Sequence, residues 1–136
     1  MPISKTLLAF AILLAFPLSA ARAQEPPAAP GPFKSVHLVK LTDAKVATLQ
    51  AALADLNAAT AKAGYPEAKY RLYKVSGKQS GDFNYLFESS WPSGEVYQKV
   101  HTDPDWLAVA KKHSEIDALR KGEIYNHYVE VPLTQK

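Results

Sequence analysis

The sequence has 136 residues, with 16 basic and 13 acidic side chains and no cysteine. The lack of cysteine excludes disulfides, cysteine nucleophiles and thiolate metal sites, so the hydrophobic core alone must stabilise the fold. Two of the basic residues, Lys5 and Arg22, lie in a leader that carries no acidic residue, which leaves 14 basic and 13 acidic residues in the rest of the chain. That balance, without a basic stripe, argues against a nucleic-acid-binding protein.

Residues 1–23 are predicted to be a cleaved signal peptide. Lys5 supplies the positive start, Leu7–Leu18 is an apolar run, and Ala21-Arg22-Ala23 is a small-residue cleavage site. The run is shorter than the roughly 20 apolar residues that span a bilayer. We therefore expect cleavage after Ala23, a periplasmic or secreted protein, and no membrane span afterwards. An uncleaved membrane anchor is the alternative.

Residues 24–32 are predicted to be an extended linker, because four of these nine residues are proline. A single folded domain is expected over 33–136. It begins with a strand rich in β-branched and aromatic residues, Phe33–Leu41. A helix over Asp43–Ala63 follows, with one apolar stripe and with Gly64 and Pro66 to end it; the stripe is Val46, Leu49, Leu53 and Leu56.

The second half of the domain is predicted to be a hairpin, a broken helical segment and a last strand. The hairpin strands are Ala68–Ser76 and Asp82–Trp91, joined by a loop with glycine at both ends. The helical segment begins after Pro92, breaks at His101–Pro104 and ends at His113, because proline suits only the first turn of a helix. A further helical turn over Ser114–Arg120 and a strand over Ile124–Val131 complete the chain.

This β-α-β-β-α-β order predicts an α+β, ferredoxin-like fold, with an antiparallel sheet and the helices on one face. The predicted strands carry apolar residues on both faces, for example Tyr70 and Leu72 on one side and Tyr73 and Val75 on the other. Helices can cover only one of these faces. We therefore expect a homodimer whose second copy covers the other face. A monomer with a tyrosine-rich surface is the alternative.

The broken helical segment and the aromatic strand before it are the predicted borders of a small-molecule pocket. His101 is a candidate acid or base because the pKa of histidine lies near neutrality, and it equally suits a helix cap. His113 is a second catalytic candidate, although its place at a helix end favours a dipole interaction. Trp106 is a candidate ligand platform or a core residue. The remaining ligand-binding candidates lie on the predicted strands: His37, Tyr85, Trp91 and His127.

The segment Trp91-Pro92-Ser93-Gly94, His101-Thr102-Asp103-Pro104-Asp105-Trp106 and His113 resembles the dimeric α+β barrel superfamily, nearest to its antibiotic-biosynthesis-monooxygenase and NIPSNAP-type branches. The resemblance covers about residues 33–131. It implies a dimeric barrel and, among the activities of the superfamily, cofactor-free monooxygenation, isomerisation or haem degradation. In the first strand His37 stands where the Asn–Trp–His set of the oxygenases and haem degraders has asparagine; Asn84 and Asn126 lie on other strands.

Two functions follow as hypotheses. The first is an exported dimer that binds a small hydrophobic or aromatic molecule in the cleft between helices and sheet. The second is a cofactor-free monooxygenase or isomerase acting on a small aromatic or polyketide-like substrate. No cofactor is expected. No metal site is expected either, because the four histidines lack a metal-binding spacing such as H-E-x-x-H.

Overall fold

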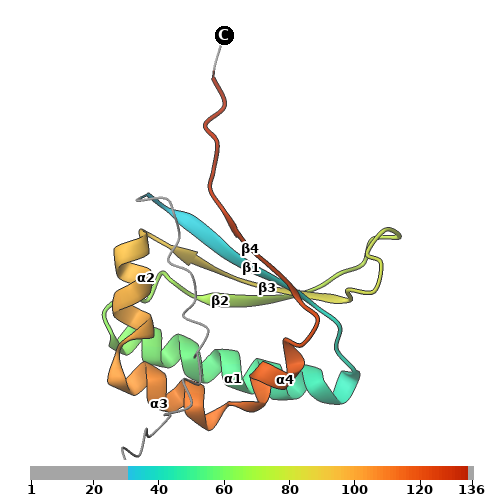
Figure 1. Cartoon of the computed structure of the whole chain (residues 1–136), viewed down its shortest axis with the longest axis horizontal. Helices are drawn as coiled ribbons and strands as arrows, with labels where there is room; N and C mark the ends of the chain where they lie inside the picture. Colours follow the sequence, from blue (N-terminus) through green and yellow to red (C-terminus); the bar gives the residue numbers. More distant parts are fainter. Residues whose placement is uncertain (1–30, 135–136) are drawn as a thin grey trace, which may run out of the picture.

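The domain is a four-stranded antiparallel sheet with four helices on one side of it (Figure 1). The computed structural model describes residues 31–134; the predicted signal peptide, 1–23, and all but the end of the linker, 24–32, lie outside them. The elements are β1 (Phe33–Val39), α1 (Asp43–Lys62), β2 (Tyr70–Lys74), β3 (Tyr85–Trp91), α2 (Gly94–His101), α3 (Pro104–Lys112), α4 (Glu115–Leu119) and β4 (Ile124–Tyr128).

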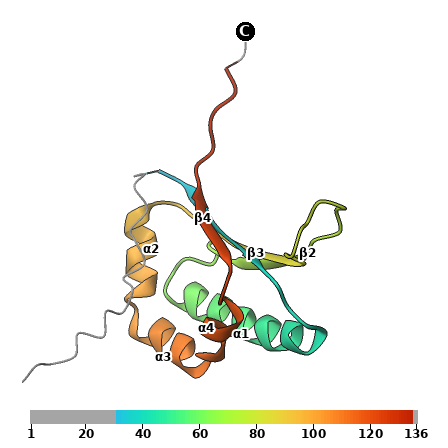
Figure 2. The same cartoon turned by 45° about the vertical axis from the view of Figure 1, so that its right-hand side comes forward.

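The sheet has the order β2-β3-β1-β4, which is the ferredoxin-like arrangement that the sequence predicts. β1 lies at the centre, with Phe87 of β3 and Tyr125 of β4 directly opposite His37 on its two sides. Alternate residues of β1 are buried, so His37 faces the helices and its neighbour Leu38 faces away. Figure 2 shows the same division from another direction, with α1, α3 and α4 beneath the sheet.

All four expected strands are shorter in the structure. β1 ends at Val39 rather than Leu41, and β2 covers Tyr70–Lys74 rather than Ala68–Ser76. β4 ends at Tyr128 rather than Val131, because Tyr128 already pairs with Lys34, near the start of β1. β3 begins at Tyr85 rather than Asp82, since Tyr85 pairs with Val39, the last residue of β1. The chain after β4 leaves the sheet and extends away from it (Figure 1).

The helix boundaries follow the local signals. The Ser93 hydroxyl accepts from the backbone N–H of Val96, and the Asp103 carboxylate accepts from Asp105 and Trp106, so each cap starts a new helix on one side of the break. Gly64 has a φ of 98°, in the left-handed region that glycine tolerates, just after α1. Thr42 precedes α1 but makes no side-chain cap bond.

The helices bury their apolar faces against the sheet in two clusters. One gathers residues of β1, α1, β3 and the loop between β1 and α1: Val39, Leu41, Leu49, Leu53, Leu56 and Phe87. The other gathers residues around the start of α2: Phe33, Ala68, Trp91, Tyr97 and Val100. Tyr70 and Trp106 pack against both clusters. No helix within residues 31–134 is long and apolar enough to cross a membrane.

Candidate functional site

A cavity of about 500 Å³ lies between the sheet and the helices, next to both core clusters. Three strands supply its floor through His37, Tyr70 and Phe87. The broken helical segment supplies much of its wall, as the sequence led us to expect. The residues that line it are His37, Leu53, Leu56, Tyr70, Phe87, Tyr97, Gln98, His101, Trp106, Leu107, Ala110, His113, Ile116, Asp117 and Arg120.

His37 is held on three sides. Its ring stacks on Phe87 at 4.2 Å and on Tyr125 at 4.3 Å between ring centres, with the two partners on the strands either side of β1. Its Nδ1 lies 2.8 Å from a carboxylate oxygen of Glu123. Burial lowers the pKa of His37 below 6.5, and the contact with Glu123 offsets only part of this. The imidazole is therefore neutral at neutral pH.

Glu123 comes from the turn between α4 and β4. Gly122, with a φ of 79°, precedes it. The second carboxylate oxygen accepts from Nε of Arg120 at 2.9 Å, so Glu123 bridges Arg120 and His37. Burial by itself would raise the pKa of Glu123, but the contacts with His37 and Arg120 outweigh burial and lower it below its usual value. The residue is a carboxylate that accepts the Nδ1 proton of His37.

His101 is enclosed by rings at the end of α2. Its Nδ1 lies 2.7 Å from the backbone carbonyl oxygen of Tyr97, one turn earlier. Ring centres of Tyr97, Trp106 and Trp91 lie at 3.8, 4.3 and 5.1 Å. Burial lowers its pKa to about 4, although the carbonyl contact favours the charged form. His101 is thus a second neutral imidazole at the cavity.

Trp106 lies on the first turn of α3, opposite His101. The Asp103 cap holds its backbone, with an N–H to Oδ1 distance of 3.0 Å. The indole Nε1 is buried and has no hydrogen-bond partner among residues 31–134. A buried donor without a partner is costly, so the surrounding packing must hold the indole in place.

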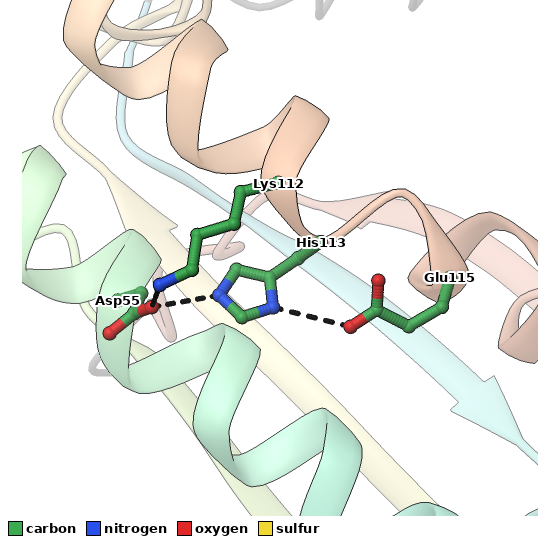
Figure 3. Close-up of polar contacts among 4 residues, drawn as sticks. All are labelled: Asp55, Lys112, His113 and Glu115. Carbon is green, nitrogen blue, oxygen red and sulfur yellow. Dashed lines mark hydrogen bonds and ion pairs between the residues drawn. The ribbon is translucent and has the colours of Figure 1, made fainter.

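His113 lines the cavity but has both ring nitrogens on carboxylates. Nε2 lies 2.8 Å from Asp55 of α1, and Nδ1 lies 3.2 Å from Glu115 at the start of α4 (Figure 3). Lys112 binds the same Asp55 oxygen at 2.9 Å. The hydrogen bond to Asp55 raises the pKa of His113 above 6.5. The arrangement suits an imidazolium that connects three helices through two carboxylates.

The other three candidates lie outside the cavity lining. Trp91 is buried beneath His101 and donates from Nε1 to the Ser89 hydroxyl at 2.8 Å. Tyr85 packs on the cluster around Val39. His127 contacts the Tyr125 hydroxyl through Nε2, at 2.6 Å.

Neither strand asparagine takes part in the cavity. Asn84 binds the backbone N–H and carbonyl oxygen of Leu41, both at 2.8 Å. Asn126 pairs with Val36, one residue before His37 along β1, and so faces away from the helices. The cavity therefore presents imidazoles rather than an asparagine amide.

Glu123 and Arg120 are the residues of this site that the sequence reasoning missed. They lie three residues apart around Gly122, in a short turn just before the last strand. In a sequence, charged residues in such a short turn are normally interpreted as solvent-exposed. The one available signal was a glutamate immediately before an aromatic strand, in a fold that places this strand beside the first.

Chemically, the cavity joins two neutral imidazoles to a mostly apolar and aromatic wall. Each histidine has its Nδ1 engaged, which leaves Nε2 as the nitrogen that can accept a hydrogen bond or a proton. Within residues 31–134 there is no group of three metal-ligating side chains.

No protein-family model matches the sequence, and no curated protein is significantly similar to it. Solved structures do match. They include a dimeric ferredoxin-like protein of unknown function from Thermobifida fusca YX, with 16% identity, a TM-score of 0.54, and 74% of this chain and 92% of that chain covered. A Caulobacter crescentus CB15 protein, described provisionally as an antibiotic biosynthesis monooxygenase, has 20% identity, a TM-score of 0.52 and coverage of 76% and 92%.

The hydroxynitrile lyase of Passiflora edulis also matches, with 14% identity, a TM-score of 0.54, and 79% of this chain and all of that chain covered. At these identities the likeness concerns the fold. It agrees with the resemblance seen in the sequence, since the matches include ferredoxin-like proteins described as dimeric and as of the monooxygenase type. The chain has the α+β, ferredoxin-like fold of these proteins.

Proposed function

We propose that this protein binds a small aromatic or otherwise hydrophobic molecule in the cavity between sheet and helices. The observation that carries the proposal is the cavity itself, whose size of about 500 Å³ lies in the range of small-molecule sites. Nine of its fifteen lining residues are apolar or aromatic, and the other six are polar or charged: His37, Gln98, His101, His113, Asp117 and Arg120. An apolar cavity with a few convergent polar groups is the usual form of a ligand site.

The test fills the cavity without changing the surface. Ala110 lines the cavity, whereas Ala108 on the same helix is exposed and does not. Native mass spectrometry of protein from its own host identifies a bound molecule, and calorimetry with 1-naphthol measures affinity. Ala110→Phe should weaken binding more than tenfold, and Ala108→Phe should leave it unchanged. Equal binding by both variants would place the ligand elsewhere.

Export and dimerisation belong to the same proposal. The apolar run and cleavage site at 1–23 support export, and the mature protein should begin at Gln24. An intact mass measured on protein recovered from the periplasm or medium checks this start.

The dimer is supported by the sheet face that the helices leave uncovered and by the Thermobifida relative, which is described as dimeric.

A second candidate function is a cofactor-free monooxygenase or isomerase, and the Glu123–His37 pair favours it. In this function Nε2 of His37 takes a proton from a C–H or O–H of the ligand, and the resulting imidazolium is paired with the Glu123 carboxylate. The ligand anion then reacts with O₂ in the monooxygenase version or regains a proton at another atom in the isomerase version.

Anthrone, an aromatic carbon acid, tests this second function. The monooxygenase version consumes one O₂ for each anthrone converted to anthraquinone and water, and the isomerase version shows as deuterium exchange into the probe without O₂ uptake. His37→Gln should lower either rate by about a hundredfold, the usual contribution of a general base. His127→Gln serves as the control, because His127 does not line the cavity. Unchanged rates in His37→Gln would remove this histidine from the chemistry.

A further inference from the structure

We infer that two of the cavity histidines, His37 and His101, are fixed in the tautomer that carries its proton on Nδ1, so that the cavity presents two hydrogen-bond acceptors and selects a hydroxylated aromatic ligand. Glu123 is the positioning residue that fixes His37 in this state. The inference rests on the proposed binding function and specifies the chemical class of its ligand.

The orientation of His37 follows from what covers its ring. Phe87 and Tyr125 stack on its two faces, and Glu123 occupies Nδ1. The edge that holds Nε2 is what remains, and His37 lines the cavity. A carboxylate can only accept, so the proton between His37 and Glu123 belongs to Nδ1 and the lone pair of the neutral ring belongs to Nε2.

Glu123 is itself held in place. Its second oxygen accepts from Nε of Arg120, and only 13% of its side chain is exposed. The positive charge of Arg120 balances the carboxylate, so the pair adds no net charge beside the cavity. Arg120 therefore does not act as a free cationic site for an anionic ligand.

His101 reaches the same tautomer through the backbone. Its Nδ1 faces the carbonyl oxygen of Tyr97, an acceptor without a proton, and so Nδ1 must donate. This contact uses Nδ1 and leaves Nε2 as the ring nitrogen that carries the lone pair. Two imidazoles on different elements thus offer lone pairs at one cavity.

The ligand class follows from these groups. An alcohol or phenol donates its proton to Nε2 of a histidine. A carboxylate offers no proton to either histidine, and Asp117 in the lining repels it. An aryl ether of the same shape fills the space but leaves a buried acceptor unpaired.

The tautomers are tested directly, without a ligand. ¹⁵N NMR of histidine-labelled protein at pH 7.5 distinguishes a protonated ring nitrogen from an unprotonated one. Both His37 and His101 should carry the proton on Nδ1. In Glu123→Gln, whose amide can also donate, His37 should become a mixture of tautomers while His101 is unchanged. Glu88→Gln is the control, because Glu88 binds Lys34 on the opposite sheet face.

A proton on Nε2 of either histidine in the wild type would overturn the inference, and an unchanged His37 in Glu123→Gln would remove the positioning role. Should Glu123→Gln not fold, Arg120→Gln frees the carboxylate to move and should also broaden the His37 tautomer signal. The wild-type spectrum decides the tautomers in every case.

The ligand class is tested with a matched pair of probes. Calorimetry should show 1-naphthol binding about tenfold more tightly than 1-methoxynaphthalene, which corresponds to about one buried hydrogen bond. Equal affinities would overturn the selection for a donor while leaving the proposed binding function intact. Failure of both probes to bind would contradict the binding function, and the NMR result would still stand by itself.

Discussion

At the scale of single residues, the buried imidazole of His101 makes the protein sensitive to acid. Its pKa is about 4 in the folded state and about 6.5 in the unfolded chain, so the neutral form is favoured by folding. Its contribution to stability is therefore present above pH 6.5 and is lost as the pH falls toward 4. The loss is about 3 kcal/mol in the free energy of unfolding.

The measurement is urea unfolding at pH 7 and at pH 4.5, on the wild type and on His101→Gln. The variant should lose much of the difference in stability between the two pH values, because glutamine does not titrate. His37 is present in both proteins and contributes equally to each. The same pH dependence in both proteins would show that His101 protonates without disturbing the fold.

Single residues also show how far the sequence predicts this site. The helix break at Pro104 indicates that His101, Trp106 and His113 belong to one segment, and the structure brings all three to the cavity. Strand alternation cannot say which face His37 occupies when both faces are apolar. The contact between His37 and Glu123 joins residues 86 positions apart, so it depends on β1 and β4 being neighbours in the sheet.

At the scale of elements, the break between α2 and α3 depends on its cap. The Asp103 carboxylate accepts from two backbone N–H groups, each at 3.0 Å, in the turn that positions Trp106. Asp103→Ala should therefore lower the free energy of unfolding by about 1 kcal/mol. Thr42→Ala is the matched control, since Thr42 precedes α1 without a side-chain cap bond and should cost only a few tenths of this. Equal losses in denaturant unfolding would show that the cap bonds of Asp103 contribute nothing.

The contact of His113 with Asp55 joins α3 to α1 and should weaken in alkaline solution. The pKa of His113 is raised in the folded state, so its stabilising contribution is complete below pH 6.5 and is lost as the pH rises through the raised value. Asp55→Asn should lower the melting temperature at about pH 5.5 and have a smaller effect at about pH 8.5. Asp82→Asn, an exposed aspartate 3.9 Å from Lys40, should show no such trend. If Asp55→Asn lowered the melting temperature equally at both pH values, the stabilising partner of Asp55 would be Lys112 and not His113.

At the scale of the whole molecule, the order of elements was predictable because each has a strong local signal. Proline and glycine mark the C-terminal end of α1 and the start of α3, and aromatic or β-branched runs mark the strands. Strand lengths were not predictable, because pairing partners set them: β4 stops at Tyr128, whose partner Lys34 is the second residue of β1. The cavity needs two core clusters that meet at Tyr70 and Trp106, a contact that no local pattern specifies.

The sheet face turned away from the helices carries the last prediction. It presents Val36, Leu38 and Leu86 at its centre, with Ile124 and Tyr73 beside them, both more than two-fifths exposed. An apolar sheet face of this kind is stabilised when a second copy covers it. We therefore expect the mature protein to be a homodimer in solution.

Light scattering after size exclusion measures the mass. Ile124→Lys places a charge on this sheet face and should convert the dimer to a monomer, because burying an unpaired ammonium group is costly. Leu107→Lys makes the same change at a residue of similar exposure, 48% against 43%, on the helical side, and should leave the dimer intact. If Leu107→Lys dissociates the protein and Ile124→Lys does not, the copies meet through their helices, and the sheet face must be covered in another way.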